Sequence, residues 1–197
     1  MAPIRTTARQ WGRGRRGPPP PSLRAGWTTR PSPRADASQS GLTTGRGIAF
    51  APRRNTRLAT VAEVEVNQAR GKVHITRLVI AHDCGLIINP DGLRGTIEAN
   101  LVQSASWALK EEVRFDRSSV ISMDWVTYPI LRAPEIPDKI EIVLINHPEL
   151  PPYGAGEPAA VATAPAIANA IFDATGARLR TVPFTPARVK AALAQRG

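Results

Sequence analysis

Apolar, mostly β-branched residues are concentrated in two neighbouring segments, 58–66 and 73–80, which the tripeptide Arg70-Gly71-Lys72 separates. Such runs are typical of strands, and the short glycine turn between them predicts a hairpin. Alternating apolar positions predict another strand over 139–146, and we expect one more over 111–116. Irregular structure is expected over the loop 82–91 and over 125–137.

Apolar residues recur at helical spacing between Gly92 and Leu109, and Trp107 is expected in the core there. The nearly continuous apolar run that follows Pro158 predicts a helix over 159–175, kinked or restarted at Pro165 and ended by Gly176. A final short helix is expected over 185–195. Together these elements predict an α+β fold of mixed strands with packed helices over residues 44–197.

Residues 1–43 differ in composition from the rest of the chain. They are rich in Arg, Pro, Gly, Ser and Thr and have no apolar periodicity, which predicts a disordered basic leader. The whole chain carries a net charge of +10, but residues 1–57 contain 12 arginines and one acid, so the remainder is close to neutral. The leader could bind an anionic surface, yet no recognition module follows it, and nucleic acid is not the expected partner.

Cysteine and histidine give no sign of a cross-linked or metal-binding protein. Cys84 is the single cysteine, so a disulfide framework is excluded, and we expect a small buried apolar side chain. The three histidines have no ligand spacing, and no direct metal ligand is expected. No segment is long enough for a membrane span, and Pro18–Pro21 stands where a signal peptide needs an apolar core, so a cytoplasmic location is expected.

The pentapeptide Gly154-Ala155-Gly156-Glu157-Pro158 is the first candidate site. Three small residues let the backbone approach a bulky neighbour. Pro158 suits the first turn of a helix, so Glu157 is expected beside free N–H groups and the positive end of the helix dipole. This environment favours an ionised carboxylate, as a general base requires. The alternative is a helix cap on a tight turn.

A second candidate site is the loop after residue 82. Asp83-Cys84-Gly85 leaves a strand, and Asn89-Pro90-Asp91-Gly92 opens a helix. Glycine turns at helix starts commonly bind phosphate groups. The alternative is an Asx turn that caps the helix.

In order and spacing, these motifs resemble the C-terminal part of the molybdenum-binding large subunit of the xanthine dehydrogenase/aldehyde oxidase family. The resemblance is strongest to bacterial members of the isoquinoline and nicotinate dehydrogenase type. Residues 1–22 do not share it. The segments that carry it are Gly45–Ala49, Val61–Val66, His82–Pro90, Ile97–Gln103, Tyr128–Leu131, Gly154–Pro158, Pro165–Ile171 and Thr175–Arg178.

The resemblance implies an oxidoreductase, a molybdenum hydroxylase that oxidises an aldehyde or N-heteroaromatic ring with water-derived oxygen. Glu157 corresponds to the catalytic base, and Gly154, Ala155 and Gly156 pass close to the metal centre. The implied cofactor is molybdenum bound by molybdopterin in its cytosine dinucleotide form. The residues implied to hold it are Asp83, Cys84, Gly85, Asn89, Thr96 and Ala99.

Two residues depart from the family pattern. Thr96 stands where the family has Gln, and its shorter side chain cannot make the same two-point contact. Ala99 stands where the family has Gly, and its Cβ is expected to crowd a close helix contact.

The family's large subunit is several-fold longer and encloses the cofactor between two halves. The implied partners are therefore the remaining N-terminal part of the molybdenum subunit, a small 2Fe–2S subunit, and a cytochrome c or FAD subunit. A split subunit, an inactive truncated remnant and a basic-tailed binding protein remain alternative interpretations.

Overall fold

The computed structural model describes residues 41–195, so the predictions for residues 1–40 lie outside the described residues. Four strands form one sheet in the order β1 (Leu42–Arg53), β2 (Thr56–Asn67), β3 (Lys72–Asp83) and β4 (Lys139–Ile145). The first three strands are antiparallel neighbours, whereas β4 runs parallel to β3. Parallel neighbours need a long crossover connection, and it contains helix α2 (Pro90–Leu109).

The predicted hairpin is confirmed as β2 and β3, and the predicted strand over 139–146 as β4. Strand β1 was missed, and it includes residues 42 and 43, which the sequence had assigned to the leader. Its two glycines and its Pro52 hide the strand pattern, because neither residue type favours strands in isolation.

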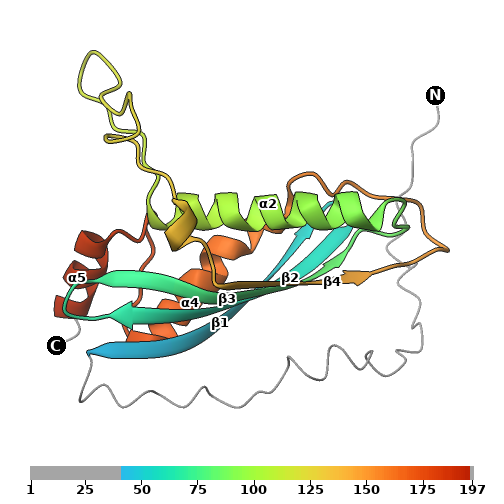
Figure 1. Ribbon diagram of the computed structural model, residues 1–197, viewed down its shortest axis with the longest axis horizontal. Coiled ribbons are helices and arrows are strands. Elements are labelled where there is room, and N and C mark those ends of the chain that lie inside the picture. Colours follow the sequence, from blue (N-terminus) through green and yellow to red (C-terminus); the bar gives the residue numbers. More distant parts are fainter. Residues whose placement is uncertain (1–40, 196–197) are drawn as a thin grey trace, which may run out of the picture.

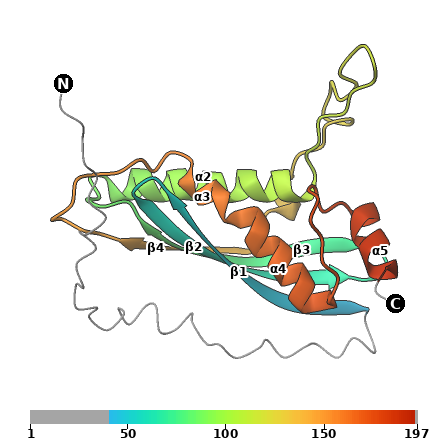
Figure 2. The ribbon, with the colours of Figure 1, turned by 180° about the vertical axis from the view of Figure 1, so that it is seen from behind.

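One face of the sheet is covered by helices. In β2, every second residue from Thr56 to Val66 is buried, as expected of a strand with one covered face. Helix α4 (Thr163–Thr175) packs on β1 and β2, and α2 packs on α4 and β4 (Figures 1 and 2). The fully buried side chains of this core include Leu58, Val64, Ile75, Leu78, Ile80, Ile97, Leu101, Ile167 and Ile171.

Helix α4 lies unusually close to strand β1. A Cβ atom at Gly47 would fall within 3.0 Å of the α4 backbone at Ala166 and Ala170, and one at Gly45 would overlap Ala170 and Ala174. The two glycines therefore let the helix approach the strand directly. Asn169 strengthens the contact by donating from Nδ2 to the carbonyl of Ile48 at 3.0 Å.

The opposite face of the sheet carries a row of charges. Arg46 and Arg77 both contact Glu63, at 2.6 and 3.3 Å, and Arg77 reaches Glu141 at 2.9 Å. Hydrogen bonds from Arg77 and Lys139 lower the pKa of Glu141 to about 2. The row crosses all four strands, and its side chains are partly buried.

The predicted helices form with shifted boundaries. The restart expected at Pro165 occurs at Ala162, between the four-residue α3 (Pro158–Val161) and α4. Pro165 then lies in the first turn of α4, where its missing N–H has no intrahelical acceptor. Gly176 ends α4 with φ 72°, as predicted, and the last helix is α5 (Pro186–Ala194), after Thr185.

Two expectations are wrong. The strand over 111–116 does not form, and an isolated bridge joins Phe115 to Val120 there instead. Phe115 and Val120 belong to a long projection, residues 113–128, that we call the arm (Figure 1). Trp107 is not in the core, since 45% of it is exposed. A three-residue 3₁₀ turn, η1 (Ala133–Glu135), follows the arm.

Candidate active site

The loop that precedes α3 is anchored from three directions. The N–H of Tyr153 donates to the carbonyl of Cys84 at 2.8 Å. The hydroxyl of Thr56, at the start of β2, donates to the carbonyl of Gly154 at 2.7 Å. Asn100, on α2, donates from Nδ2 to the carbonyl of Gly156 at 2.6 Å. The backbone on both sides of Ala155 is therefore fixed by groups from β2, the 84–85 turn and α2.

The glycines around this loop have different roles. Gly85 has φ +75°, and a Cβ there would overlap the carbonyl of Pro151. The absence of a side chain at Gly85 therefore lets the segment before Glu157 pack against the 84–85 turn. Gly154 and Gly156 have no atom within 4 Å of the position of a Cβ. Their small size is therefore not needed for packing among the described residues, and they leave free space beside Glu157.

Glu157 lies directly before α3, as predicted, with Pro158 at the helix start. Its side chain makes no capping hydrogen bond, and 73% of it is exposed. Arg53, the last residue of β1, contacts it with Nη2 3.1 Å from Oε1. Exposed ion pairs of this kind contribute about 0–1 kcal/mol. The carboxylate is therefore held near the loop yet open to another molecule.

Glu157 borders an open pocket of about 750 Å³ between its loop and the β1–β2 turn. Arg53 and Arg54 line the same pocket, and Arg54 has a left-handed φ of 56°. Two arginines beside one carboxylate make this pocket suitable for an anionic group. Tyr153, Gly154 and Gly156 complete the side that belongs to the loop.

The predicted residues of the 83–89 loop do not line the pocket of Glu157. Cys84 contacts the loop of Glu157 through its carbonyl, which accepts from Tyr153. Asp83 accepts a hydrogen bond from the N–H of Gly85 at 3.1 Å, and Asn89 caps α2 by accepting from Gly92 at 2.9 Å. The loop therefore contains the Asx turn and the helix cap that the alternative interpretation expects. Cys84 is buried, as predicted, and burial raises the pKa of its thiol.

Thr96 and Ala99 lie on α2, beside the loop of Glu157. The hydroxyl of Thr96 donates to the carbonyl of Gly92 at 3.0 Å, and its own carbonyl accepts from Asn100 at 2.8 Å. Ala99 is exposed, so the expected crowding of a helix contact is wrong for the described residues. Asn100 was missed as a site residue, although an amide one turn after Thr96 was a readable signal.

His82 is fully buried on the helix-covered face of β3, and neither ring nitrogen has a hydrogen-bond partner within residues 41–195. Desolvation lowers the pKa of His82, and the neighbouring Asp83 charge raises it less. The folded protein therefore holds His82 in its neutral form.

We expect the stability of the chain to fall as the pH drops below about 6.5. The unfolded chain protonates His82 there, whereas the folded chain does not, so the loss reaches up to about 1.4 kcal/mol per pH unit until the lowered pKa is passed. Urea unfolding between pH 5 and pH 8 measures the slope. In His82→Leu this contribution should disappear, and an unchanged slope would contradict the assignment.

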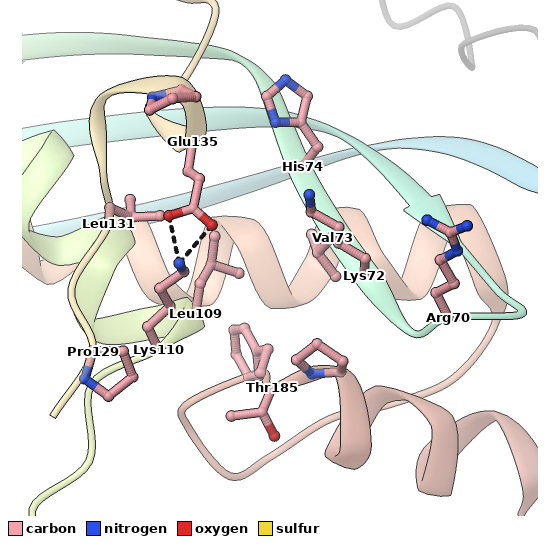
Figure 3. Close-up of a pocket in the computed structure, with 13 residues that line it drawn as sticks. Arg70, Lys72, Val73, His74, Leu109, Lys110, Pro129, Leu131, Glu135 and Thr185 are labelled. Carbon is pink, nitrogen blue, oxygen red and sulfur yellow. Dashed lines mark hydrogen bonds and ion pairs between the residues drawn. The ribbon is translucent and has the colours of Figure 1, made fainter. Parts of the chain in front are cut away.

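A second pocket, of about 470 Å³, lies near the opposite end of the sheet, where the β2–β3 turn meets the start of α5 (Figure 3). Leu109, Leu131 and Phe184 line it, with Arg70 and Lys72 at its edge. None of the predicted site residues borders this pocket, so it is separate from the site of Glu157.

Within residues 41–195, no group of three His, Cys, Asp or Glu side chains is placed to hold a metal ion. In the same part of the chain, no helix combines the length and apolarity that crossing a membrane requires.

Residues 43–137 match the family model of the molybdopterin cofactor-binding domain. A nicotinate dehydrogenase subunit of Pseudomonas putida is 43% identical over 182 residues, which cover 88% of this chain. The beta chain of isoquinoline 1-oxidoreductase of Brevundimonas diminuta is 30% identical over 141 residues, which cover 72% of it. The chain belongs to the molybdopterin cofactor-binding domain family. This assignment confirms the family expected from the motifs.

The fold agrees with the same assignment. Quinoline 2-oxidoreductase from Pseudomonas putida 86 superposes with a TM-score of 0.66 over 72% of this chain, at 27% identity. The α+β class predicted from the sequence is thereby confirmed. The chain spans 15% and 18% of the length of the two relatives and 19% of the solved structure.

Proposed function

We propose that this chain forms part of a molybdenum hydroxylase in which Glu157 is the general base. The proposed reaction oxidises an aldehyde or N-heteroaromatic compound with water-derived oxygen. The names of the relatives support the second class of substrate, since nicotinate and isoquinoline are nitrogen-containing aromatic compounds.

One observation carries the proposal: the carboxylate of Glu157 is exposed, makes no capping bond, and lies beside free space at Gly154 and Gly156. A plain helix cap would direct its oxygen at the N–H groups of α3. A base must instead lie within reach of the proton that it accepts. The anchored loop supplies this position, because Thr56 and Asn100 fix the carbonyls on either side of Ala155.

The residues around the pocket fit a large anionic cofactor such as molybdopterin. Gly154 and Gly156 would admit it, and Arg53 and Arg54 would balance phosphate charge. When bound, this cofactor supplies oxygen transfer and accepts the electrons taken from the substrate. Glu157 would accept a proton at Oε1 or Oε2, and Arg53 would orient the carboxylate.

The finer assignments rest on the same family relationship. The cytosine dinucleotide form, the 2Fe–2S partner and the further cytochrome c or FAD partner are proposals, as is the contribution of Asp83, Cys84, Gly85, Asn89, Thr96 and Ala99 to binding the pterin. The bonds of Asp83 and Asn89 favour an indirect role, in which they shape the loops. The cytoplasmic location stays a prediction.

We expect the chain to purify without stoichiometric molybdenum when it is produced alone. Cofactor sites usually bury most of the ligand surface, and the pocket beside Glu157 is open on one side. Metal analysis after co-expression with the remaining part of the molybdenum-binding protein should show a clear rise in molybdenum content. Tightly bound stoichiometric molybdenum in the isolated chain would contradict the shared site, and no rise after co-expression would favour the inactive remnant.

A further inference from the structure

The arm, residues 113–128, extends away from the sheet and helices in both views of the molecule (Figures 1 and 2). Its large apolar side chains point into solvent, with Met123 exposed to 81% and Val126 to 84%. Soluble monomers rarely gather such side chains on one surface unless another molecule covers it. The seven exposed apolar residues are Val113, Phe115, Val120, Ile121, Met123, Trp125 and Val126.

Internal hydrogen bonds hold the arm in one shape. Asp116 accepts from the N–H groups of Ser118 and Ser119 at 2.8 and 2.9 Å. Asp124 accepts in the same way from Thr127 at 2.7 Å. These bonds lower the pKa of both carboxyl groups, because the N–H groups donate to the ionised carboxylate and stabilise it.

The base of the arm is closed as well. Arg114 donates to the carbonyl of Thr127 at 3.1 Å, and the hydroxyl of Tyr128 donates to Glu111 at 2.8 Å. The apolar side chains are therefore carried by an ordered backbone, which reduces the entropy lost when a partner binds.

We propose that the arm docks into an apolar groove on the part of the molybdenum-binding protein that this chain does not contain. The proposal rests on the proposed function. The length of the relatives indicates this partner for the arm. The chain spans 15% and 18% of two relatives, and their remaining sequence is available to cover the arm. Permanent interfaces are more apolar than transient ones and resemble a domain core cut in half, and the arm has this character.

The position of the arm agrees with such docking. It follows the C-terminal end of α2, whereas the loop of Glu157 is bound near the middle of that helix through Asn100. A partner on the arm therefore need not cover the pocket of Glu157. Asp116, Asp124 and Arg114 are engaged inside the arm, and Arg117 is exposed beside the seven apolar side chains, which make up most of the surface offered to a partner.

The test measures binding to the nicotinate dehydrogenase relative from Pseudomonas putida, after deletion of the segment that this chain matches. The unaltered chain should bind this probe. Combined Phe115→Ser, Met123→Ser and Trp125→Ser should weaken binding about 30-fold or more, because buried aromatic anchors dominate interfaces. Val182→Ser, which changes an exposed apolar residue outside the arm, is the matched control and should bind as the unaltered chain does.

Failure of the unaltered chain to bind, or equal binding by the triple variant, would overturn the proposal. Self-association of the chain that the triple variant abolishes would assign the arm to a second copy and overturn it too. Thermal unfolding of the triple variant should match that of the unaltered chain, which separates lost docking from misfolding. The binding measurement requires neither molybdenum nor turnover. It therefore tests the docking of the arm even if Glu157 is not the catalytic base.

Discussion

Glu157→Gln should lower the turnover of the enzyme reconstituted with the rest of the molybdenum-binding protein by about 10²–10⁴-fold, the usual contribution of a positioned general base. An amide keeps the shape of the side chain but cannot accept the proton. Molybdenum content should stay the same, because the anchoring bonds of the loop come from Thr56, Asn100 and Cys84 and involve its backbone.

The stability of this variant should change by less than about 1 kcal/mol, because the ion pair that it loses is exposed. Arg53→Gln is the matched control, since it removes the same ion pair and keeps the carboxylate. Its turnover should fall much less than that of Glu157→Gln. The single-turnover rate of substrate oxidation measures the difference. Full turnover by Glu157→Gln would refute the catalytic assignment.

Gly47→Ala should destabilise the chain by about 3 kcal/mol or more, the upper range for an overpacked core. The added Cβ would overlap the backbone of α4 at Ala166 and Ala170, and backbone cannot move aside by changing a rotamer. Helix α4 would have to withdraw from β1, which opens the core along the whole helix. Denaturant unfolding monitored by circular dichroism gives the difference in free energy.

Gly95→Ala is the control, with an expected effect of opposite sign. Gly95 lies inside α2, and a Cβ there has no atom within 4 Å. Alanine favours a helix over glycine by about 0.8–1 kcal/mol, so this variant should be more stable than the unaltered chain. Equal small losses in both variants would show that the close contact of α4 with β1 is not essential.

Sequence patterns identified the elements that bury a continuous face within this chain. The β2–β3 hairpin and α4 were predictable because their apolar residues meet partners among the described residues. The predicted strand over 111–116 does not form, although Val113 and Phe115 alternate with polar residues as in a strand. Alternation reports which residues are apolar, and it does not report whether a second strand lies alongside. Trp107 lies one residue from Ala108, which rotates it by about 100° away from the buried stripe.

The site was predictable in part for a similar reason. The motif around Glu157 is local, so the residue could be chosen from its neighbours. Arg53, Thr56 and Asn100 lie 104, 98 and 56 positions away from their partners in the loop, so topology alone brings them together. The roles of Gly154, Gly156 and Gly85 could not be predicted from the sequence either. Only the three-dimensional structure distinguishes a glycine that another segment packs against from one that leaves free space.

The position of α4 also has a consequence for synthesis on the ribosome. Strands β1 to β3 are complete once residue 83 has emerged, yet α4, which covers β1 and β2, ends at residue 175. At about 5–20 residues per second, the uncovered apolar side of the nascent hairpins waits for roughly 5 to 20 seconds. Through this interval Leu58, Val64 and Val66 are available to chaperones or to other nascent chains. The yield of folded protein should therefore depend more on translation speed between β3 and α4 than on speed elsewhere in the gene.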